Sequence, residues 1–119
     1  MREKVRDKGR LEHILYACNA LLQSKDKYEF EIIKDDPVLF YGFVKLAEII
    51  GEASYMLTKE FRAAHTDIPW EQMIGLRHVL VHGYYTIKPR QLWNIIEKDI
   101  PVLKPQIEHL LATVDFPEE

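Results

Sequence analysis

The chain has 119 residues, and its 16 Lys and Arg against 19 Asp and Glu give a formal net charge of −3. We expect a single domain over residues 1–119 with one hydrophobic core, because the chain is too short for two ordinary domains. An apolar fraction of 47% and a charged fraction of 29% exclude a disordered or fibrous chain. The lone cysteine excludes a disulfide framework, and the charged N-terminus and short apolar runs predict no signal peptide and no membrane span. We therefore expect a cytoplasmic protein.

The first predicted element is a helix from about Glu3 to Gln23. Its apolar residues recur three and four positions apart, as one buried face of a helix requires. They are Leu11, Ile14, Leu15, Cys18, Leu21 and Leu22. The polar run Ser24–Lys27 predicts a break, and Tyr28 to Lys34 predicts a short helical turn.

A long central helix is predicted to start at Asp36-Pro37, because Asp is a favoured N-cap and Pro fits the first helical position. Its core positions recur four or three residues apart as far as a helix end near His65. They are Leu39, Phe43, Leu46, Ile50, Ala53, Leu57 and Phe61. A second stripe is small enough to admit a close helix, and consists of Ala47, Gly51 and Ser54. A third, polar stripe consists of Lys45, Glu48, Glu52 and Lys59.

The next predicted helix runs from Pro69 to about Val81, with Gly83 as its stop. A fourth begins at about Gln91, and Asp99 and Pro101 interrupt it before an apolar pattern resumes. No segment alternates with the period of a strand. The sequence therefore predicts an all-α fold, an antiparallel bundle of four or five helices with one long central helix.

The charge is unevenly distributed along the chain. Residues 1–10 carry +3 and residues 72–96, which contain no acid, carry another +3, while the remainder carries −9. The acid-free stretch has two interpretations of equal weight. It either presents an anion-binding surface or is partly buried and so lacks charges of both signs.

The densest group of functional side chains is residues 77–85. Arg77 shares a helix face with apolar residues, so its guanidinium needs an anion, a carbonyl or a carboxylate. One alternative is a structural Arg bonded to a helix end or an acid. His82 lies at the predicted helix end, where an imidazole acts as a general acid or base, or simply as a cap. Five residues place Arg77 and His82 about 140° apart on a helix. Either the helix ends between them or a second copy of the chain completes the site.

Other reactive residues carry weaker signals. His78 and His82 have the i, i+4 spacing of metal ligands, but no acid lies between them, so we predict no metal and no cofactor. Cys18 lies in a core stripe and is interpreted as an apolar filler. The three isolated histidines are interpreted as surface or helix-end residues, and are His13, His65 and His109.

The pattern Arg77-x4-His82-x-Tyr84 resembles the signature of the HepT-like HEPN proteins. Segments in the same order along nearly the whole chain also resemble that family. They are Ile50-Gly-Glu-Ala53, Ile68-Pro-Trp70, and Leu92-Trp93 ahead of Asp99-Ile-Pro101.

The resemblance implies a helical homodimer in which two Arg-x4-His motifs meet across a shared cleft. It implies a metal-independent endoribonuclease toxin, neutralised when an MntA-like nucleotidyltransferase antitoxin adenylylates the motif Tyr. By this resemblance His82 is the general acid/base on RNA, Arg77 stabilises the pentacoordinate phosphorane, and Tyr84 is the modified residue. In that family the residue after the motif Arg is commonly a small polar one, whereas here it is His78. This histidine either adds an accessory acid/base group or alters the usual chemistry.

Two other functions are compatible with the same residues. In the first, the cleft is a non-catalytic nucleotide- or RNA-binding module that partners a nucleotidyltransferase. In the second, the chain is a structural adaptor that dimerises through its long helix. Substitution of His82 would leave either of these largely unchanged, whereas it would abolish a ribonuclease.

Overall fold

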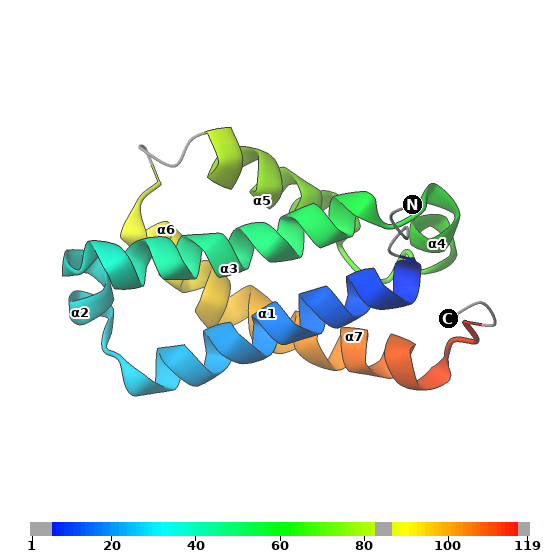
Figure 1. Cartoon of the computed structure of the whole chain (residues 1–119), viewed down its shortest axis with the longest axis horizontal. Coiled ribbons are helices and arrows are strands. Elements are labelled where there is room, and N and C mark those ends of the chain that lie inside the picture. Colours follow the sequence, from blue (N-terminus) through cyan, green and yellow to red (C-terminus); the bar gives the residue numbers. More distant parts are fainter. Residues whose placement is uncertain (1–5, 83–86, 117–119) are drawn as a thin grey trace, which may run out of the picture.

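The computed structural model describes residues 6–82 and 87–116, and for residues 78–82 it describes the backbone alone. Within these ranges every regular element is helical, which confirms the predicted all-α class. Four long rods run antiparallel to their neighbours (Figure 1). They are α1 (Asp7–Lys27), α3 (Pro37–Met56), α5 (Trp70–His82) and a composite rod of α6 (Pro89–Asn94), a π-helical segment (Ile95–Asp99) and α7 (Ile100–Thr113). Two short helices connect the first three rods, α2 (Phe30–Asp35) and α4 (Lys59–Ala64).

Helix α1 buries the apolar stripe predicted for it. Leu11, Ile14, Cys18 and Leu21 have no exposed surface. The predicted break after Gln23 is wrong, because the helix continues through the polar residues to Lys27. Basic side chains in this last turn interact favourably with the carbonyl end of the helix.

Helix α3 begins as the sequence predicts. One carboxylate oxygen of Asp36 accepts hydrogen bonds from the backbone N–H groups of Val38, at 2.9 Å, and Leu39, at 3.2 Å. These are orphan donors of the first helical turn, and Pro37 has no N–H that needs a partner.

The predicted end of the long helix near His65 is wrong. Helix α3 stops at Met56, Leu57 adopts an extended conformation, and Thr58 caps the separate helix α4 by accepting from Phe61 N–H at 3.2 Å. Asp7, at the start of α1, accepts hydrogen bonds from the Thr58 N–H at 2.9 Å and from its hydroxyl at 2.8 Å. Leu57 remains buried at the break, so the apolar spacing of the long helix holds as far as this residue.

The composite rod also differs from the prediction. Its helix starts at Pro89, and Asp99 and Pro101 do not interrupt it. Instead the N–H of Ile100 donates to the carbonyl of Ile95, five residues back. A π-helical turn inserts one extra residue, and the chain passes Pro101, which has no N–H to donate, without stopping.

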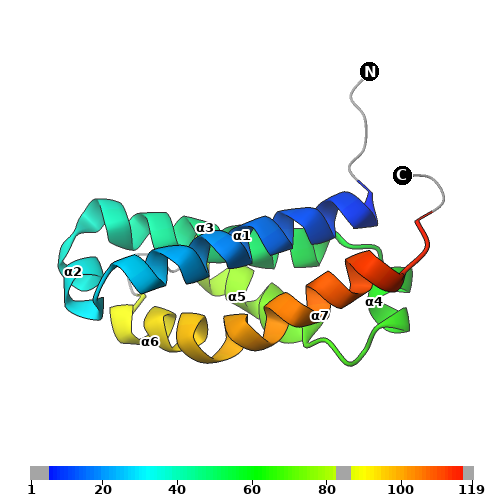
Figure 2. The ribbon, with the colours of Figure 1, turned by 90° about the horizontal axis from the view of Figure 1, so that it is seen from below.

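One hydrophobic core joins the rods, and α7 lies beside α1 in both views (Figures 1 and 2). Cys18 lies inside this core, where burial raises the pKa of its thiol to about 12. The interpretation of Cys18 as an apolar filler is therefore confirmed. Among the helices of the described ranges, none is long and apolar enough to cross a membrane.

Candidate active site

Arg77 lies where α5 comes closest to α3. At Gly51 of α3, an added Cβ would lie 2.5 Å from the Arg77 Cβ and 2.7 Å from its backbone nitrogen. Only a residue without a side chain permits this approach. The small stripe of α3 therefore admits a neighbouring helix, as the sequence predicts, and that helix is the one that carries Arg77.

The Arg77 side chain turns back onto α3. Its Nε donates to the Glu52 carboxylate, and its guanidinium carbon lies 4.5 Å from the centre of the Tyr55 ring. The hydrogen bond to Glu52 raises the pKa of Arg77 above its usual value. The predicted need of this guanidinium for an anion is thus met by a carboxylate within the same chain.

The bond to Glu52 does not enclose the charged group. About 29% of the Arg77 side chain and 47% of the Glu52 side chain remain exposed. A guanidinium carries five N–H donors in a planar fork, and this contact uses the one on Nε. The arrangement fixes the plane of Arg77 and is compatible with donation from its terminal nitrogens to phosphate oxygens.

His82 is the last residue of α5, which confirms its predicted place at a helix end. The helix is continuous from Arg77 to His82, so the alternative in which it ends between them is wrong. Their divergence of about 140° therefore stands. The side chains of His78 and His82 lie outside the described residues, as does the whole of Tyr84, so the roles assigned to these three remain predictions.

Sequence reasoning missed Glu52 and Tyr55 as partners of Arg77. It placed Glu52 on a polar stripe of the long helix without a partner. The available signal was the neighbouring Gly51, which marks the point where another helix can approach and so the carboxylate within reach of it.

The acid-free stretch fits neither interpretation alone. Met73 and Leu92 are buried, whereas Lys88 and Arg90 are exposed. The Arg90 guanidinium lies over the Phe30 ring, 3.8 Å from its centre, and Arg77 is paired with Glu52. Arg77 and Arg90 are therefore held by contacts within the chain, while other residues of the stretch fill the core.

The remaining histidines are located as predicted. His13 and His109 are exposed, and His65 follows the last turn of α4. In the described part of the chain, no three side chains of His, Cys, Asp or Glu gather as metal ligands would.

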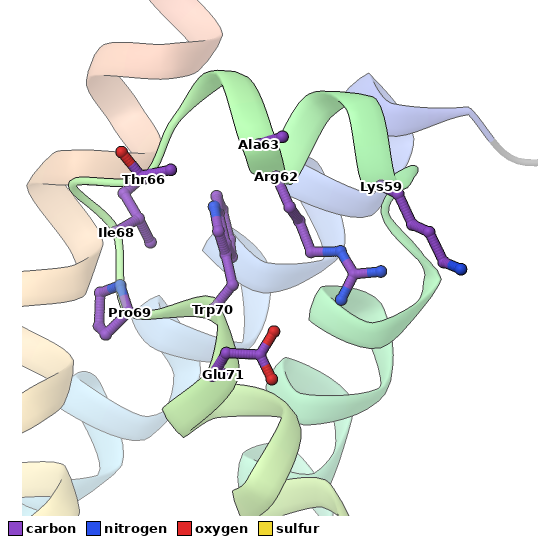
Figure 3. Close-up of a pocket in the computed structure, with 8 residues that line it drawn as sticks. All are labelled: Lys59, Arg62, Ala63, Thr66, Ile68, Pro69, Trp70 and Glu71. Atoms are coloured by element: carbon purple, nitrogen blue, oxygen red, sulfur yellow. The ribbon is translucent and has the colours of Figure 1, made fainter.

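Another hollow, of about 620 Å³, lies at the first turn of α5, away from Arg77 (Figure 3). Arg62 and Glu71 both reach into it, beside the indole of Trp70 (Figure 3). Trp70 donates from Nε1 to the His65 carbonyl at 2.9 Å, which fixes the wall of the hollow. The family-like segment Ile68-Pro-Trp70 lines this hollow, but the residues that line it offer no general acid/base of the imidazole kind.

Comparisons with known proteins point to one family. A family model described as ribonuclease HepT-like matches residues 12–110. A protein of Caldanaerobacter subterraneus subsp. tengcongensis, provisionally named an RNase, is 43% identical over 101 residues, 85% of this chain and 90% of the relative. A Thermococcus cleftensis protein named probable ribonuclease HepT is 34% identical over 103 residues, 87% of this chain and 94% of the relative. No solved structure matches this chain at a significant level.

Proposed function

Because this chain belongs to the HepT-like ribonuclease family, we propose that it is a metal-independent endoribonuclease and the toxin of a toxin–antitoxin pair. The observation that carries the proposal is Arg77. It is held in a fixed plane by Glu52 and is partly exposed, on a helix whose sequence continues as the Arg-x4-His-x-Tyr motif.

The proposed reaction uses the nucleophile that RNA itself contains. The ribose 2′-oxygen attacks the adjacent phosphorus, and the bond from phosphorus to the 5′-oxygen breaks. The products are a 2′,3′-cyclic phosphate and a 5′-hydroxyl. His82 takes the proton of the 2′-hydroxyl or supplies one to the leaving oxygen, while Arg77 stabilises the charge of the phosphorane. These two groups supply the proton transfer and the charge, so the reaction requires no metal.

We propose that the working unit is a homodimer. Arg77 and His82 diverge on a continuous helix, so one copy cannot readily direct both side chains at the same phosphate. Tyr55 of α3, whose ring lies against the Arg77 guanidinium, is 49% exposed and offers apolar surface next to Arg77 for a second copy. In such a dimer the Arg of one copy and the His of the other can share a cleft.

The proposed antitoxin is an MntA-like nucleotidyltransferase that adenylylates Tyr84. An added AMP would introduce negative charge and bulk two residues after His82. By the rule that governs phosphorylation, this charge would repel RNA from an anion site. The proposed setting of the pair is the cytoplasm.

Cleavage assays on purified protein test the proposal. With EDTA present, the wild type should cut RNA and leave 2′,3′-cyclic phosphate ends. His82→Ala should lower kcat/KM by roughly 10²–10⁴-fold and Arg77→Ala by roughly 10²–10³-fold, because each removes a group that acts in the transition state. Circular dichroism should show both variants folded. Intact RNA after incubation with the wild type would contradict the proposal.

The same variants separate the alternative, a non-catalytic nucleotide- or RNA-binding module that partners a nucleotidyltransferase. The specific observation in its favour is the ion pair of Arg77, since a held guanidinium suits binding as well as catalysis. In that case His82→Ala has little effect, Arg77→Ala weakens RNA affinity, and expression of the wild type does not arrest growth.

A further inference from the structure

A second hollow, of about 190 Å³ and lined by charged residues of both signs, lies next to the Arg77 site, between α1 and α3. These two helices lie side by side in both views (Figures 1 and 2). Arg10 and His13 line the hollow from α1, and Lys45, Glu48 and Glu52 line it from α3. Glu52 is therefore shared, because it borders this hollow and also bonds to Arg77.

The hollow is lined by two cations and two carboxylates, but one of these carboxylates is paired with Arg77, which lies outside the lining. Lys45 lies 3.3 Å from Glu48, and Glu52 is bonded to Arg77, so each carboxylate already has a cation. The Nε of Arg10 is buried and, in the described part of the chain, has no hydrogen-bond partner. Arg10 lines the hollow, and among the described residues neither carboxylate of the hollow is paired with its guanidinium, so this charged group suits an anionic acceptor there.

We propose that this hollow binds a backbone phosphate of the RNA, one that neighbours the phosphate held by Arg77. The proposal rests on the proposed function, since it names where the substrate continues beyond the cleaved bond. Sites that enclose a whole small molecule have volumes of about 300–1,000 Å³. A hollow of about 190 Å³ therefore suits one group of a longer ligand, and a phosphodiester is the anion that repeats along RNA.

The proposal also gives a role to the basic residues at the start of the chain. Arg10 is the last of five basic residues among residues 1–10, a segment of charge +3 that the catalytic motif does not use. The fold brings Arg10 to α3, next to the residue that holds Arg77. Arg10 and Arg77, one from each basic part of the sequence, thereby both lie next to Glu52, along one path for a polyanion.

The test measures binding of a fluorescent single-stranded 2′-O-methyl RNA, which has no free 2′-hydroxyl and cannot be cleaved by the proposed reaction. Arg10→Gln should weaken binding about tenfold, and the slope of log K against log salt should fall by about 0.7, the loss of one phosphate contact on a single strand. Lys27→Gln is the matched control, since it removes one positive charge from the exposed far end of the same helix and should bind as the wild type does.

A second variant covers the case in which Arg10→Gln does not fold. Lys45→Glu changes an exposed residue at the rim, so the fold should tolerate it, and its new carboxylate should repel a phosphate and weaken binding at least tenfold. Lys27→Glu is its control. Arg10→Lys should restore part of the affinity, because it restores the charge without the planar fork.

The outcomes separate this proposal from the proposed function. If the wild type cleaves RNA, but the folded variants in the hollow bind the probe as tightly as the Lys27 controls do, the phosphate site is overturned and the ribonuclease stands. If RNA stays intact while Arg10→Gln or Lys45→Glu weakens binding, the phosphate site stands and the ribonuclease is overturned. If the wild type does not bind the probe, the phosphate site is overturned.

Discussion

Helices α1 and α5 both pack against α3, but they do so in different ways. In α1 the residues Leu11, Ile14 and Leu21 are fully enclosed, so the contact is made by large apolar side chains along most of the helix. In the part of α5 whose side chains are described, residues 70–77, the buried apolar residues Trp70 and Met73 lie at its start, and at its far end the contact with α3 is that of Arg77 with Gly51. The first arrangement stabilises the bundle, and the second positions a charge.

The largest expected effect concerns stability and α1. Ile14→Ala should lower the free energy of unfolding by about 3 kcal/mol, because it removes buried methyl groups and leaves a cavity in a closed core. The value of kcat/KM for RNA should stay close to that of the wild type wherever the variant is folded. Urea denaturation at fixed protein concentration gives the first quantity and a cleavage assay the second.

A large fall in kcat/KM for folded Ile14→Ala would contradict the division of roles between α1 and α5. It would mean that the position of Arg77 depends on the core as a whole.

The next effect concerns the contact of α5 with α3. Gly51→Ala places a methyl group 2.5 Å from the Arg77 Cβ, so α5 must move away from α3. A displacement near 1 Å at a catalytic group lowers kcat/KM about a hundredfold, which a cleavage assay on RNA would detect. The cost in stability should be about 1–3 kcal/mol.

Two other glycines serve as controls for Gly51. An added Cβ at Gly42 of α3 or at Gly75 of α5 meets no atom within 4 Å. Because Ala is the better helix former, Gly42→Ala and Gly75→Ala should be stabilising by up to about 1 kcal/mol and should cleave RNA normally. If Gly51→Ala behaves like these two, the close approach does not position Arg77.

The smallest effect concerns the carboxylate that holds Arg77. Glu52→Ala should lower kcat about tenfold with little change in KM, because the guanidinium is then no longer held in one plane. Glu52→Gln keeps an oxygen that can accept from Nε and should recover most of the rate. Steady-state kinetics on a short RNA measures both. Equal losses for the two variants, or a loss only in KM, would show that Glu52 does not position Arg77 for chemistry.

The start of α3 could be predicted from the sequence, whereas its end could not. Asp36-Pro37 is a local signal, because the capping carboxylate and the orphan N–H groups are two and three residues apart. At the break after Leu57, Thr58 caps the next helix locally, and Asp7 also binds Thr58 from 51 residues away, a contact that no local pattern reveals. Periodicity alone therefore extended the helix too far, since Leu57 and Phe61 still fit the apolar spacing on both sides of the break.

Arg77 could be found from the sequence, but the geometry around it could not. A charged residue on an apolar helix face signals a need for a partner, and the motif singles it out. The choice of Glu52 as that partner depends on the axial position of α5 along α3, which the contact at Gly51 sets. The sequence pattern of either helix alone does not determine that axial position.

The contact between α1 and α7 has a consequence for the order in which the protein folds during synthesis. Leu11 and Ile14 are translated before Glu52 and Arg77, whereas residues such as Leu103 and Ile107, which complete the same core, are translated after them. The nascent chain thus carries an open apolar face until α7 emerges, whereas the partners Glu52 and Arg77 are both translated earlier. The proposed toxin therefore completes its scaffold only after both partners of this ion pair have been translated.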